Sequence, residues 1–131
     1  MKISNFNASR ISPWLCALAL GCGAMPAWAG GDAHRGEDVF AQECAECHSA
    51  KEGKNKKGPS LFAVVGRKAA GIADFVYSEA IKQSGITRSV SALDAYLSAP
   101  RKAVPGGKMK FDGLADAKDR EDLLAYLATL R

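Results

Sequence analysis

The stretch Cys44-Ala45-Glu46-Cys47-His48 constrains this chain of 131 residues more than any other part of it. Two thiols three positions apart, followed at once by an imidazole, form the C-x-x-C-H pattern of covalent haem attachment. The thiols can add to the two vinyl groups on one edge of a porphyrin, and the imidazole can bind the iron from the same side. The pattern therefore predicts one haem c, bonded through Cys44 and Cys47, with His48 as an iron ligand.

Two other kinds of site share part of this pattern. A C-x-x-C pair can be a redox dithiol or half of a zinc site. Zinc would need two further ligands, and the remaining candidates are His34 and the pair Cys16 and Cys22 in an apolar N-terminal segment. A redox dithiol normally lies where a strand meets a helix, and no strand pattern surrounds Cys44. The haem interpretation is favoured, with a disulfide or dithiol and a zinc site as the alternatives.

Residues 1–29 have the layout of a secretory signal peptide. Lys2 and Arg10 give a positively charged start, an apolar run follows over residues 11–23, and Ala27-Trp28-Ala29 is a small-x-small cleavage site. The apolar run is short for a membrane span. We therefore expect residues 1–29 to be removed and the mature chain to be periplasmic. Retention as an anchor and lipidation at Cys22 are the alternatives.

Residues 30–131 are expected to form one small domain. The leader holds two basic residues and no acidic one, so 16 Lys and Arg remain against 14 Asp and Glu, too mild a balance for a nucleic-acid-binding protein. The mature thiols are Cys44 and Cys47, the thioether is Met109, and the imidazoles are His34 and His48. Basic residues gather after the haem pattern and around Met109: Lys51, Lys54, Lys56, Lys57, Arg101, Lys102, Lys108 and Lys110.

Helices are predicted at both ends of the mature chain. Asp32 is expected to cap the first, which carries Gly36 and Phe40 on one face. The last is expected to start near Asp116 or Asp119 and to run to residue 130 with one apolar stripe. Glycine within a helix suggests close approach of another helix, so we expect the two to cross; separate contacts with the core are the alternative. The predicted contact joins Gly36 and Phe40 to Leu123, Tyr126 and Leu127.

Between these ends the pattern predicts two shorter helices and long loops. One short helix is expected over residues 78–84. The next is expected to begin at Ser89 or Ser91, where Ser91 and Asp94 resemble a capping box, and to end shortly before Pro100. Loops fill the remainder.

Nearly all of residues 31–131 resemble class I cytochromes c, in particular the mitochondrial-like branch that also occurs in bacterial periplasms. The resemblance implies a small all-α cytochrome c fold, in which the N- and C-terminal helices cross and short helices and long loops surround the haem. The matching segments are Gly36-x-x-x-Phe40, Cys44 to His48, Gly58-Pro59-Ser60-Leu61, Val65-Gly66-Arg67, Phe75-x-Tyr77-Ser78-x-Ala80, Leu93-x-x-Tyr96-Leu97, Pro105-Gly106-Gly107-Lys108-Met109 and Leu123-x-x-Tyr126-Leu127.

The resemblance implies roles for individual residues of the iron site. Cys44 and Cys47 would form the thioethers, and His48 would bind the iron through one ring nitrogen. Its other nitrogen would be held by the carbonyl of Pro59. Met109 would be the opposite axial ligand, and His and Met together raise the potential of a haem. A buried core methionine and ligation by His34 are the alternatives for this second ligand.

Further residues are implied around the haem propionates. Arg67 and Tyr77 match positions whose side chains contact a propionate; an ordinary surface arginine and a core tyrosine are the alternatives. One departure matters, because the family usually has a tryptophan where this chain has Arg88. We expect Arg88 to pair with the same propionate, replacing an indole N–H by a charge. A simply exposed Arg88 is the alternative.

With both axial positions filled by protein, the resemblance implies an electron carrier rather than an enzyme. We expect a soluble, monomeric periplasmic protein that carries one electron between a quinol-oxidising membrane complex and a terminal oxidase or reductase. The lysines would steer partners with acidic docking surfaces. A small haem enzyme such as a peroxidase, and a sensor of nitric oxide or carbon monoxide, are the alternatives; both need an iron with an open position.

Overall fold

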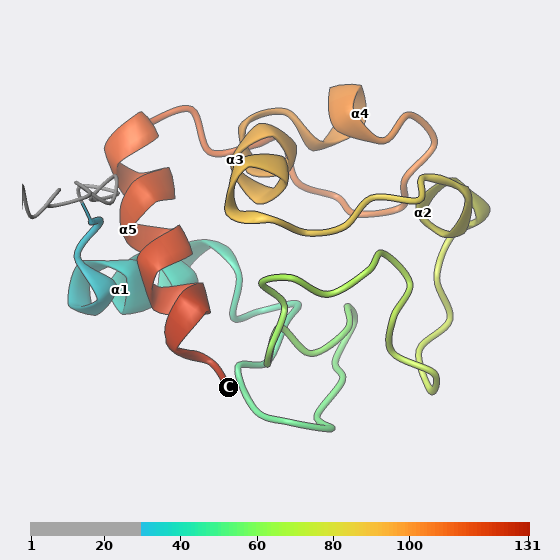
Figure 1. Ribbon diagram of the computed structural model, residues 1–131, viewed down its shortest axis with the longest axis horizontal. Coiled ribbons are helices and arrows are strands. Elements are labelled where there is room, and N and C mark those ends of the chain that lie inside the picture. Colours follow the sequence, from blue (N-terminus) through green and yellow to red (C-terminus); the bar gives the residue numbers. More distant parts are fainter. Residues whose placement is uncertain (1–29) are drawn as a thin grey trace, which may run out of the picture.

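The computed structural model describes residues 30–131, which contain five helices and no strand (Figure 1). The predicted all-α class is confirmed. The expectations for the leader, including cleavage after Ala29 and the alternative at Cys22, concern residues outside this part. Among residues 30–131, none of the helices has the length and apolar character needed to cross a membrane. The helices are α1 (Ala33–Glu43), α2 (Glu79–Gln83), α3 (Val90–Ser98), α4 (Pro100–Ala103) and α5 (Ala117–Thr129).

Helices α1 and α5 cross in close contact, so the two ends of the described chain lie side by side (Figure 1). The close approach requires a glycine in α1. A Cβ at Gly36 would clash with the backbone carbonyl of Asp122 and lie 2.8 Å from the Cβ of Tyr126. Phe40, one turn further on, packs against Tyr126 with 5.5 Å between the ring centroids. The predicted crossing is confirmed.

The apolar core adjoins this crossing. Helix α5 contributes more buried side chains than any other helix, including Leu124, which the predicted stripe left out. Burying side chains of this kind stabilises the fold by roughly 1.5–3 kcal/mol each. The buried members of the core are Phe40, Val64, Leu93, Leu97, Leu123, Leu124 and Leu127.

Side-chain oxygens cap the start of four helices. At α1, Asp32 accepts hydrogen bonds from the backbone N–H groups of His34 and Arg35, as predicted. Such caps satisfy N–H groups that have no partner inside the helix and are worth about 1 kcal/mol each. The other three caps are Ser78 for α2, Ser89 for α3 and Asp116 for α5.

The predicted capping box at Ser91 and Asp94 is wrong. Ser89 caps α3 instead, and Asp94 is paired with Arg120 of α5 at 2.8 Å. Pro100 also does more than follow a helix, because it begins α4. A proline fits the first position of a helix, where its missing N–H would have had no partner.

Two arginines fix the long loops through backbone carbonyls. Arg67 donates to the carbonyls of Ser60 and Phe62, both at 2.8 Å. Arg120, whose side chain is only 14% exposed, donates to the carbonyls of residues 114 and 115 at 2.8 and 2.9 Å. Satisfied carbonyls allow irregular chain to pack against the core without burying unpaired polar groups.

One carboxylate is completely buried at the helix crossing. Asp122 accepts a hydrogen bond of 2.6 Å from the backbone N–H of Asp32 and forms ion pairs with Lys118 and Arg35. Hydrogen bonds, from Lys118 first and then from the Asp32 backbone, hold the pKa of Asp122 below its ordinary value. The fold therefore stabilises the ionised form, which ties the start of α1 to α5.

We expect Asp122→Asn to remove an acid-sensitive part of the stability. The pKa of Asp122 is lower in the folded protein than in the unfolded chain, where it is about 3.9. Its ionised form therefore stabilises the fold at neutral pH, and this contribution fades as the pH falls through the folded pKa. Denaturant titrations at several pH values should show the free energies of unfolding of parent and variant converging in acid.

The exposed neighbour Glu121 supplies the control for this experiment. Glu121→Gln removes a carboxylate from the same helix and should follow the pH dependence of the parent. A difference between the parent and Asp122→Asn that stays constant from neutral to acidic pH would contradict the assignment.

Candidate functional site

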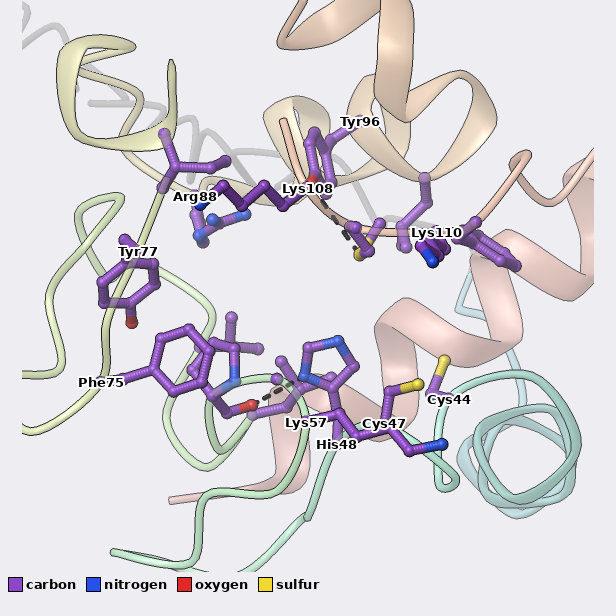
Figure 2. A pocket seen from close by; sticks show the side chains of 18 of the residues that line it. Cys44, Cys47, His48, Lys57, Phe75, Tyr77, Arg88, Tyr96, Lys108 and Lys110 are labelled. Carbon is purple, nitrogen blue, oxygen red and sulfur yellow. Dashed lines mark hydrogen bonds between the residues drawn. The ribbon is translucent and has the colours of Figure 1, made fainter. Parts of the chain in front are cut away.

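A cavity of about 530 Å³ opens between α3 and the loops that follow α1. Its volume lies within the range of roughly 300–1,000 Å³ that is typical of small-molecule sites. Figure 2 shows its two walls: His48 and Lys57 lie on one, and Tyr96, Arg88 and Lys108 lie on the other. Apolar side chains form much of the lining between these walls, as expected for a site that takes a flat apolar ligand.

His48 is held with one ring nitrogen free. Its Nδ1 donates a hydrogen bond of 2.7 Å to the carbonyl of Pro59, so Nε2 carries the lone pair. Burial is the main cause that lowers the pKa of His48, and the bond to Pro59 opposes it. The ring is therefore neutral at pH 7. Gly58 leaves room for it, because a Cβ there would lie 2.8 Å from Nδ1 and closer still to Cε1.

Helix α1 ends at Glu43 with Cys44 as its C-cap, which places both thiols at the cavity. Cys44 and Cys47 are free thiols that line it, near His48 (Figure 2). Burial raises the pKa of the Cys44 thiol to about 11, and the charges of Glu43 and Cys47 add to the effect. The nucleophile of a redox dithiol has a lowered pKa instead. Within residues 30–131 no cluster of three His, Cys, Asp or Glu is arranged to hold a metal ion, so zinc also gains no support.

The opposite wall carries Met109, whose sulfur accepts a hydrogen bond from the hydroxyl of Tyr96 at 3.9 Å. The dashed line at Tyr96 in Figure 2 marks this bond. Burial raises the pKa of Tyr96, opposed by the positive charge of Arg88, so the hydroxyl keeps its proton. From the sequence, Tyr96 was named only within the segment Leu93-x-x-Tyr96-Leu97 and was given no role at the site. A tyrosine rather than a leucine at this position was the available signal, because a buried phenol needs a polar partner.

The three residues predicted to contact the haem propionates do not all line the cavity. Tyr77 and Arg88 line the cavity, and the guanidinium of Arg88 lies 5.4 Å from the ring centroid of Tyr96. The hydroxyl of Tyr77 accepts a hydrogen bond of 3.3 Å from the backbone N–H of Ile72. Arg67 does not line the cavity, and its guanidinium is bonded to loop carbonyls. The structure thus brings two of the three predicted residues to the wall.

His34, the alternative imidazole, is exposed near the start of α1 and does not line the cavity. The basic residues predicted around the site are also spread out. Lys57, Lys108 and Lys110 line the cavity, and Lys57 is paired with Glu46 at 2.6 Å. Positive charge therefore lies on both walls.

Comparison with known proteins shows which proteins this chain resembles. The family model described as Cytochrome c matches residues 33–131. Cytochrome c of Gibberella zeae is 47% identical over 100 residues, which cover 76% of this chain and 94% of that protein. Cytochrome c of Arabidopsis thaliana is 45% identical over 98 residues, covering 74% and 88%. The structure of cytochrome cH from Methylobacterium extorquens aligns with a TM-score of 0.71 at 45% identity, covering 76% of this chain and 99% of that one.

The residues around the cavity fit a covalently attached haem. Two free thiols lie beside His48, which offers a neutral imidazole with an available lone pair. The thioether of Met109 belongs to the other wall. A soft sulfur and an imidazole are both good iron ligands, and the apolar lining suits a porphyrin.

We expect Gly58→Ala to displace the imidazole of His48. The added methyl group would overlap the ring, which must tilt and lengthen its hydrogen bond to the Pro59 carbonyl. NMR spectra of the ring nitrogens and of the Nδ1 proton should report the change. Gly53→Ala is the control: the φ of 63° at Gly53 makes that substitution strained as well, but its Cβ would meet nothing within 4 Å and should leave the imidazole in place. An unchanged His48 signal in Gly58→Ala would contradict this geometry.

Proposed function

The chain belongs to the cytochrome c family of electron-transfer haem proteins, and from this premise we propose which residues bind its haem c. Cys44 and Cys47 form the thioethers, His48 binds the iron through Nε2, and Met109 binds it from the opposite wall. Bound there, the haem supplies an iron centre that takes up and releases one electron.

The observation that carries this proposal is that both candidate ligands are already oriented by neighbours. The Pro59 carbonyl fixes the ring of His48 at 2.7 Å, and the Tyr96 hydroxyl contacts the sulfur of Met109 at 3.9 Å. Two protein ligands leave no position for a substrate, and ligands held in place need little rearrangement when an electron moves. The site therefore suits a one-electron carrier rather than an enzyme.

Three residues are proposed to meet the carboxylates of the haem. Tyr77 and Arg88 line the cavity and can reach an anionic group inside it. Arg67 uses part of its guanidinium on two loop carbonyls, and its five N–H donors leave others for a carboxylate. Charge and hydrogen bonds are needed here, because a carboxylate that leaves water loses its hydration.

We further propose that the protein acts as a monomeric carrier in the periplasm after removal of residues 1–29. It would move electrons from a quinol-oxidising membrane complex to a terminal oxidase or reductase. The charged start, apolar run and small-x-small site of the leader support export. A purified exported protein whose mass equals residues 30–131 plus one haem would agree; a lipid on Cys22 or an uncleaved leader would not.

We expect Met109→Ala to abolish the sulfur-to-iron charge-transfer band of the ferric protein and to lower its reduction potential. The lowering should be about 0.1 V or more, since axial ligands span roughly 0.8 V in haem proteins. Lys110→Gln, a neighbour that also lines the cavity, is the control for local disturbance. A parent protein without the band, or one whose ferrous form readily binds carbon monoxide, would favour the enzyme and sensor alternatives.

The lysines of the cavity walls are proposed to guide acidic partners to the haem edge. We expect Lys108→Glu to slow oxidation of the ferrous protein by the small anion ferricyanide, most strongly at low salt. Screening should reduce the difference at higher ionic strength, where the Debye length falls to about 8 Å or less. Stopped-flow rates test this, with Lys82→Glu as the control because Lys82 lies on α2 outside the lining. Equal effects of the two changes would argue against steering.

A further inference from the structure

Arg88 differs from the other cations that line the cavity, Lys57, Lys108 and Lys110, because those three are exposed and Arg88 is not. Lys57 is paired with Glu46, whereas the side chain of Arg88 makes no hydrogen bond or ion pair with residues 30–131. Arg88 is nevertheless half-buried. Such a group needs a compensating partner, because a cation that leaves water loses hydration energy.

Backbone hydrogen bonds fix the position from which the Arg88 side chain extends. The Arg88 N–H donates to the carbonyl of Arg67 at 2.9 Å, and the Arg88 carbonyl accepts from the N–H of Gly66 at 2.8 Å. An isolated bridge between Lys68 and Thr87 holds the same two segments together. Arg88 therefore projects from a fixed point into the cavity, where Figure 2 shows it beside Tyr96.

The partner that the structure gives to Arg88 is the aromatic ring of Tyr96. The guanidinium carbon lies 5.4 Å from the ring centroid, within the distance at which a cation is attracted to an aromatic face. The same ring carries the hydroxyl that donates to the sulfur of Met109 at 3.9 Å. A positive charge close to a phenol draws electron density from its oxygen and makes the O–H a stronger hydrogen-bond donor.

We propose that Arg88 is a positioning residue for Met109 and acts through Tyr96. Its charge holds the ring of Tyr96 in place and strengthens the hydrogen bond to the sulfur, which keeps the thioether directed into the cavity. Arg88 would thereby govern how firmly Met109 is held at the iron. This inference depends on the proposed function, because it assumes that Met109 is the iron ligand.

The test is competition between Met109 and added imidazole in the ferric holoprotein. Imidazole that takes the place of the sulfur removes the sulfur-to-iron charge-transfer band, so its apparent affinity measures how firmly Met109 is held. Arg88→Gln should raise that affinity roughly two- to thirtyfold, the factor that corresponds to the range of cation–π energies. Arg88→Lys retains a cation and should recover most of the effect. Lys54→Gln removes an exposed charge outside the cavity lining and should leave the affinity at the value of the parent.

A double-mutant cycle separates this role from pairing with the haem carboxylates alone. In a Tyr96→Phe background the ring remains but the hydroxyl is gone, so Arg88→Gln should change the imidazole affinity little. Equal effects of Arg88→Gln in the two backgrounds, or no effect in the parent, would overturn the inference. A parent protein without the band would instead overturn the proposed ligation. Unfolding followed by circular dichroism, measured in parallel, shows whether any variant has lost its fold.

Discussion

The contact between α1 and α5 at Gly36 determines where the rest of the molecule lies. The missing side chain lets the α1 backbone reach the carbonyl of Asp122, and Phe40 then packs on Tyr126 one turn later. A helix docked at that point is followed at once by Cys44, its C-cap, beside the cavity. The thiols of Cys44 and Cys47 are thus positioned by the packing of the preceding helix α1 against α5, which comes from the other end of the chain.

The cavity and the core are parts of one apolar assembly. Val64, Leu93, Leu97 and Leu127 belong to the buried core and also line the cavity. A domain of this size with long loops has few helices with which to bury apolar surface, so a flat apolar cofactor completes the core. Binding the cofactor and stabilising the fold therefore rely on the same side chains.

Much of the fold and of the candidate site was predictable from the sequence, because it depends on the chemistry of neighbouring residues. The C-x-x-C-H pattern and the Asp32 cap depend on short-range spacing, and the structure has both. The contact of Gly36 with the last helix spans the chain, but it was marked by a glycine within one helix and an apolar stripe on the other. The polar pairings across the chain were not visible. Tyr96 bonds to Met109 thirteen residues away, and Asp122 bonds to Asp32 ninety residues away, so no local pattern marks either. The capping box failed for the same reason, because Asp94 is taken by Arg120 from another helix.

The side chain of Arg120 ties together three parts of the molecule. One planar guanidinium on α5 holds α3 through Asp94 and the chain just after the Met109 loop through two carbonyls, a fork that a lysine could not reproduce. The backbone N–H of Leu114 also donates to the carbonyl of Leu97 at 2.8 Å, so α3 holds the same segment directly. The Met109 wall therefore depends on the contact between α3 and α5, and the His48 wall depends on the contact between α1 and α5. Both walls of the cavity are thus anchored to one helix, and their separation is set by how α1 and α3 pack against it.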